Sequence, residues 1–208
     1  MTAFYREGCF LFVICSISRR LLCFEIEMGG KKNLSAAIIF TPLKKPVMNE
    51  YEIFDACRRG DLALVQELCA ANPALVNAVD MKGFTPLVLA AYNEQAAIVD
   101  FLIANGADLN VQDAAGNTAL MGVSFKGYKE IAKRLLDAGA NVNLRNSNGA
   151  PAITFAATFG HLQIAEWLLQ HGADLSLCDS RGKTPIDHAV IQGNEAMVEL
   201  FQKYLPSA

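Results

Sequence analysis

The chain has 208 residues, of which 52% are apolar and 9% aromatic, a composition typical of a folded protein that buries a core. Its net charge is −3, but residues 1–47 carry seven Lys or Arg against three Asp or Glu, and the remainder carries eleven against eighteen. Because nucleic-acid binding depends on neutralising phosphates, we exclude nucleic acid as a partner of this acidic remainder.

Residues 1–47 form an N-terminal extension to which the sequence assigns no structure. Its apolar run over residues 8–17 is too short to cross a bilayer, which requires about 20 apolar residues, and it makes a poor signal peptide. Two interpretations stay open. The tract is disordered or absent from the native protein, since Met28 and Met48 are both credible starts, or its basic residues attach the chain to anionic lipid.

From residue 50 onward the chain repeats itself at an interval of 33 residues. Glycine recurs at this spacing in two separate series, Gly83, Gly116, Gly149 and Gly182, and Gly106, Gly139 and Gly172. Two glycine series in one register indicate a stacked repeat array. We predict five units, at about 50–79, 80–112, 113–145, 146–178 and 179–205.

Each unit carries the signals of two helices and a long turn. Thr85 can cap the first turn of a helix, and Pro86 at the first helical position loses no needed donor. A second helix is predicted over 96–104, and Gly106 ends it in a left-handed conformation. The polar run over 108–117 then predicts a turn or hairpin that leads to the next unit. The same pattern predicts second helices over 62–70, 130–138, 162–170 and 195–204.

The order of helix, short turn, helix and long turn, on these Thr-Pro and glycine motifs, resembles the ankyrin repeat. The resemblance implies an all-α solenoid of stacked helix–turn–helix units with β-turn or hairpin loops over 48–208. One departure concerns the histidine that in this family follows Thr-Pro-Leu and braces neighbouring loops by hydrogen bonds. Other residues stand in its place, which puts the local stiffness of the loops in question: Val88, Met121, Thr154 and Asp187.

No group of residues predicts a catalytic, cofactor or metal site. His161, His171 and His188 are expected to be structural; His188 adjoins Asp187, but neighbouring helical side chains point about 100° apart. The recurring Asp and Asn residues do not match a calcium loop, so we expect them to cap turns. Six cysteines without a Cys-x-x-Cys pair favour free thiols, a reducing compartment and a cytoplasmic location.

In ankyrin repeats, partners are usually held by the turn tips and by the inner face of the first helices. The residues at those positions predict a partner-binding site of Arg58, Arg59, Met81, Lys82, Phe84, Tyr92, Phe125, Lys126, Phe159 and Arg181. Two interpretations of the three successive aromatic residues, Tyr92, Phe125 and Phe159, stay open. They pack under their own hairpins, or they form an exposed strip flanked by cationic residues, the commonest anchors at interfaces.

We therefore predict a non-catalytic protein-interaction module that acts as a single chain. The alternative is a membrane-tethered adaptor that uses residues 1–47, and an enzyme or small-molecule binder is disfavoured. The last unit ends in several large apolar residues, which either fold back on the fourth unit, the preferred interpretation, or form a contact surface themselves: Met197, Val198, Leu200, Phe201, Tyr204 and Leu205.

Overall fold

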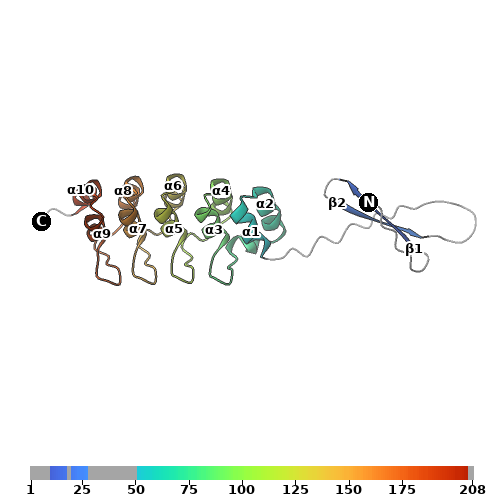
Figure 1. Cartoon of the computed structure of the whole chain (residues 1–208), viewed down its shortest axis with the longest axis horizontal. Helices are drawn as coiled ribbons and strands as arrows, with labels where there is room; N and C mark the ends of the chain where they lie inside the picture. Colours follow the sequence, from blue (N-terminus) through green and yellow to red (C-terminus); the bar gives the residue numbers. More distant parts are fainter. Residues whose placement is uncertain (1–9, 18–19, 28–50, 206–208) are drawn as a thin grey trace, which may run out of the picture. The chain divides into compact units, whose positions relative to one another are not determined.

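The computed structural model describes residues 10–17, 20–27 and 51–205 (Figure 1). The chain divides into two compact units, Met1–Val47 and Met48–Ala208. In the first unit, strands β1 (Phe10–Ile17) and β2 (Arg20–Glu27) pair antiparallel, with Phe10 opposite Glu27. Both segments are rich in strand-forming Phe, Val, Ile and Leu, a signal to which the sequence analysis assigned no structure. The all-α prediction therefore holds for the second unit alone.

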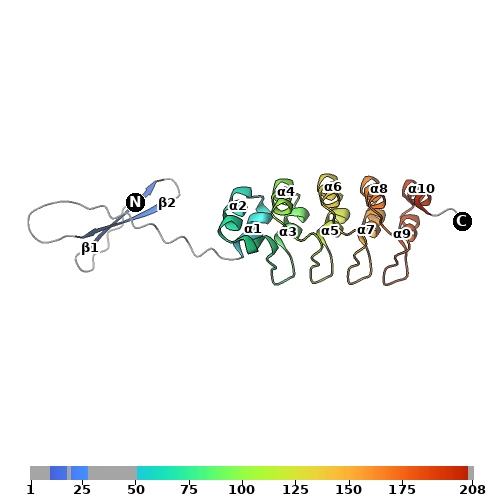
Figure 2. The same ribbon diagram turned by 180° about the vertical axis from the view of Figure 1, so that it is seen from behind.

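In the second unit, the described residues form five pairs of α-helices that follow one another in chain order (Figures 1 and 2). Each first helix packs against the first helix of the next pair, and each second helix against the next second helix. The long turns project as hairpins along one edge. The pairs are α1 (Glu52–Arg59) and α2 (Leu62–Ala71), α3 (Pro86–Tyr92) and α4 (Ala96–Ala104), α5 (Ala119–Lys126) and α6 (Lys129–Asp137), α7 (Ala152–Phe159) and α8 (Leu162–Gln170), and α9 (Pro185–Ile191) and α10 (Glu195–Tyr204), with the short 3-10 helix η1 (Pro73–Asn77) after α2.

The first helices begin where the Thr-Pro motif predicts. The hydroxyl oxygens of Thr85, Thr118 and Thr184 accept hydrogen bonds from the backbone N–H three residues later. Asp187 completes a capping box with Thr184. α1 and α7 are the exceptions among the first helices: Tyr51 and Pro151 stand in the place of threonine, and neither supplies a side-chain cap.

The core forms between consecutive units. Alanines on the first helices, including Ala90 and Ala156, are fully buried, and their small size lets neighbouring helices approach closely. Leu102, Leu135 and Leu168 fill the equivalent place on successive second helices and are likewise fully buried. Each unit thus covers the apolar flank of the one before it, as expected for a solenoid.

The C-terminal helix folds back on the array. Met197 and Phe201 of α10 are completely buried, and α10 packs against α8 and α9. The preferred interpretation of this apolar segment is thereby confirmed. Only Tyr204 and Leu205, at the end of the described chain, remain 43% exposed.

Side chains at the start of each hairpin hold its turn. The Oδ1 atom of Asp113 accepts hydrogen bonds from the backbone N–H groups of Ala115 and Asn117. The equivalent oxygens of Asp80, Asn146 and Asp179 do the same in the other units. The capping role predicted for these residues is confirmed.

Successive hairpins are also bonded to one another. The N–H groups of Ala114, Ser147 and Ser180 donate to carbonyl oxygens of the preceding hairpin at 3.1, 3.0 and 2.7 Å. The amide of Gln112 donates to the carbonyls of Gly116 and Arg145, so one side chain joins two hairpins. Arg145 repeats this bridge one unit later, to Gly149 and Cys178. These bonds brace the loops where the histidine of the family is missing.

Candidate partner-binding surface

The three successive aromatic residues lie at or near the ends of three adjacent first helices. Tyr92 is the last residue of α3, Phe125 lies one residue before the end of α5, and Phe159 is the last residue of α7. Their side chains are 44%, 37% and 48% exposed, respectively. Since none of them is covered by its own hairpin, the structure favours the exposed strip over the packed alternative. We call Tyr92, Phe125 and Phe159 the aromatic strip.

The members of the aromatic strip contact one another across the units. The rings of Phe125 and Phe159 meet edge to face, with centroids 4.6 Å apart and planes at 75°. The Nζ atom of Lys126 lies 4.6 Å from the centroid of the Tyr92 ring and 6.0 Å from that of Phe125. The strip is therefore one connected surface, because edge-to-face and cation–π contacts both fix the groups that make them.

Two apolar residues of the last unit extend this surface. Ile191 occupies the repeat position of Tyr92 and Phe125, and it is 58% exposed. Val190, at 60% exposed, occupies the position of Ala91 and Ala157, which are buried by the following unit. Sequence reasoning did not include Val190, because that position is a core position wherever another unit follows.

The predicted cations divide into paired and unpaired groups. Nη1 of Arg58 lies 2.7 Å from Oδ1 of Asp55, and Arg181 pairs with Asp179 at 3.2 Å. Arg59, Lys82 and Lys126 make no ion pair with any residue in 51–205. The charges of these three residues are thus still open to a partner, and Lys126 is the one that contacts the aromatic strip.

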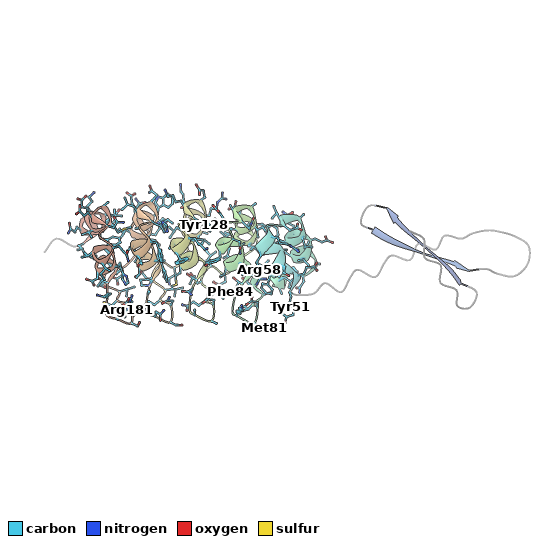
Figure 3. All side chains as sticks on the ribbon, in the orientation of Figure 1. Tyr51, Arg58, Met81, Phe84, Tyr128 and Arg181 are labelled. Carbon is cyan, nitrogen blue, oxygen red and sulfur yellow. The ribbon has the colours of Figure 1, made fainter. Side chains whose placement is uncertain are left out.

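The hairpin residues of the predicted site differ in exposure. Met81 is 93% exposed, and Lys82 is also exposed. Phe84 is half-buried and packs against the core, so its main contacts lie inside the array. Figure 3 places Met81 and Arg181 at the hairpin edge, in different units.

The buried histidine of the last unit has a partner that sequence reasoning missed. Nε2 of His188 lies 3.0 Å from Oδ2 of Asp179, and both side chains are buried. Nδ1 of His188 lies 3.2 Å from the hydroxyl of Thr158, which itself donates to the Thr154 carbonyl. The network joins α7, α9 and the last hairpin. Asp179 is a hairpin-start residue like Asp113, but nothing in the sequence marks it as a histidine partner.

The carboxylate of Asp179 is held ionised by its surroundings. The backbone N–H of Lys183 contributes most to lowering its pKa below the usual value, followed by the N–H of Arg181 and the side chains of His188 and Arg181; burial opposes these contributions. A group with a depressed pKa stabilises the fold above its unfolded pKa of about 3.9 and loses this contribution as the pH falls below it.

We therefore expect Asp179→Asn to lower the free energy of unfolding by about 2 kcal/mol at pH 7, the usual contribution of hydrogen bonds to a charged group. The difference from the wild type should shrink as the pH falls from 4 toward 2, because the unfolded wild-type chain takes up a proton at Asp179 in this range while the folded carboxylate stays ionised. Urea titrations followed by circular dichroism and by Trp167 fluorescence at several pH values measure it. A difference that stays constant down to pH 2 would contradict the assignment.

Two further features of the described part of the chain bear on chemistry, a groove and a buried thiol. A groove of about 440 Å³ lies between units two and three, lined by Asn93, Glu94, Gln95, Ala96, Tyr128, Glu130, Ile131 and Arg134. Within residues 51–205, no three His, Cys, Asp or Glu side chains gather as a metal site would require. Burial raises the pKa of the Cys57 thiol to about 12, which makes it unreactive.

A membrane span is also missing from the described helices, since none is long and apolar enough to cross a bilayer. The hypothesis of membrane attachment through residues 1–47 concerns side chains outside the described set, and it stays a prediction.

Comparison with known proteins agrees with this architecture. A family model described as "Ankyrin repeats (3 copies)" matches residues 53–146 and 120–205, which together span more than half of the chain. The chain therefore belongs to the ankyrin-repeat family, and the predicted family and fold are confirmed. No curated protein matches the sequence. Ankyrin repeats are generally protein–protein interaction modules.

Proposed function

We propose that this chain is a non-catalytic binding module that holds a partner protein on the aromatic strip and the neighbouring hairpin tips. The observation that carries the proposal is the continuity of the strip: three half-exposed rings on adjacent units, joined by ring–ring and cation–π contacts. Aromatic side chains dominate the binding energy of many interfaces. A single exposed aromatic residue is common on protein surfaces and needs no explanation, whereas a connected group of three does.

The way the strip is held also supports binding. Its residues lie at or near the ends of helices whose other faces are buried, and the hairpins that lead into these helices are braced by Gln112 and Arg145. A surface fixed in this manner loses little conformational freedom when a partner docks, which lowers the cost of association.

Site-specific photo-crosslinking tests this proposal. p-Benzoylphenylalanine replaces Phe125 in one variant, Phe159 in a second and Tyr204 in a third; Tyr204 is similarly exposed at 43% but lies outside the strip. After irradiation in lysate of the source cells, we expect mass spectrometry to find the same protein attached at 125 and 159. Attachment of that protein at 204 to the same extent, or no protein specific to 125 and 159, would contradict the proposed surface.

A further inference from the structure

The charge around the aromatic strip is opposite to that of the domain that carries it. Residues 51–205 contain eleven Lys or Arg against seventeen Asp or Glu. Ten residues at the C-terminal ends and C-caps of the first helices nevertheless include three cations and no acid: Arg58, Arg59, Tyr92, Asn93, Phe125, Lys126, Thr158, Phe159, Ile191 and Gln192. A positive surface on an acidic domain attracts a negatively charged partner.

One of these cations is fixed on the strip without a counter-ion. Asp55 and Asp80 neutralise Arg58, at 2.7 and 3.6 Å. Lys126 makes no ion pair with a carboxylate in 51–205, and its ammonium group lies over the Tyr92 ring. A partner that covers the strip removes water from this charge, which is costly unless the partner supplies an anion.

The other end of the strip is apolar. Phe125 and Phe159 meet edge to face, and Ile191 and Val190 follow on the next unit. The Nζ atom of Lys126 lies 6.0 Å from the centroid of the Phe125 ring on the same helix, and the Phe159 ring meets Phe125 from the next unit. An extended peptide advances about 3.3 Å per residue, and its side chains two residues apart face the same side. The step from the cation to the ring pair therefore corresponds to about two residues of an extended chain.

We propose, as a deepening of the function proposed above, that the partner segment is an extended acidic peptide. One Asp or Glu side chain pairs with Lys126, and a large apolar side chain about two residues away packs on Phe125 and Phe159. A second copy of this chain fits less well, because pairing one strip with another places Lys126 and Arg59 against like charges.

A random twelve-residue peptide library displayed on phage tests this inference. The library is selected in parallel on the full-length wild type, on Lys126→Glu and on the triple variant Tyr92→Ala, Phe125→Ala, Phe159→Ala. Thermal unfolding of each protein shows whether it is folded. Lys126→Gln is a further control, because it removes the positive charge without placing a negative charge at the end of the helix. Sedimentation velocity of the wild type and of Lys126→Glu measures self-association.

We expect peptides selected on the wild type to share an Asp or Glu about two residues from a large apolar residue. Lys126→Glu should lower the affinity for these peptides about tenfold, and Lys126→Gln should lower it less. Selection on Lys126→Glu should instead yield peptides with Lys or Arg at the position of the acid. Strip-dependent peptides without an acidic preference would overturn this inference alone. So would a wild-type dimer that Lys126→Glu dissociates, because the occupant would then be a second copy. Peptides that bind the triple variant as tightly as the wild type would overturn the proposed function as well.

Discussion

Replacing Gly116 with alanine is expected to lower the free energy of unfolding by about 2 to 4 kcal/mol. Gly116 has φ of 77°, a conformation that costs an alanine about 1 kcal/mol. A Cβ atom there would also lie 2.7 Å from the backbone nitrogen of Ser147 and 3.0 Å from Cα of Asn146, both in the next hairpin. Backbone cannot yield as a flexible side chain does, so the hairpins must separate, at a cost of about 1 to 3 kcal/mol more.

Gly182 supplies the matched control for this prediction. Its φ is 72°, almost the same as that of Gly116, but a Cβ atom there would meet nothing within 4 Å. We expect Gly182→Ala to cost only about 1 kcal/mol, the conformational part of the penalty. Urea denaturation of both variants separates the two contributions. Equal losses at the two positions would show that close stacking of the hairpins contributes little to stability.

The repeat itself could be predicted from the sequence because the same residue types recur at a fixed spacing. Two glycine series and the Thr-Pro motif gave the helix order, and the bounds of α4 and α8 agree with those expected. These signals are local, since a left-handed glycine ends a helix wherever it occurs.

Contacts between units could not be predicted in the same way. Gln112 and Arg145 are 33 residues apart and make equivalent bridges between hairpins. Because they are different residue types, no recurring residue in the sequence predicts these bridges. His188 finds Asp179 only after the last hairpin folds against α9. The exposure of the aromatic strip similarly depends on how neighbouring units cover each side chain, which a sequence position does not state.

The second large effect is expected on binding. Replacing Tyr92, Phe125 and Phe159 together with alanine should weaken the affinity for the partner identified by crosslinking at least about a hundredfold, which is about 2.7 kcal/mol. The loss should exceed what any one ring contributes, since Phe159 supports Phe125 and Tyr92 holds Lys126 in place. Stability should fall by no more than about 1 to 2 kcal/mol, because the rings are half-exposed and the ring–ring contact contributes about 0.5 to 1.5 kcal/mol.

A second triple variant shows whether the loss is specific to the strip. Leu162, Tyr204 and Leu205 are 41%, 43% and 43% exposed, and all three lie outside it. Their replacement with alanine removes exposed apolar surface of similar accessibility, and the affinity should then stay within about twofold of the wild type.

Calorimetric titration of the identified partner into the wild type and these two triple variants is the most direct test of the central claim. The claim is that stacked units fix three rings as one contact surface. It predicts that binding is lost with Tyr92, Phe125 and Phe159 and kept without Leu162, Tyr204 and Leu205. Unchanged affinity in a folded strip variant, or equal loss in both, would contradict it.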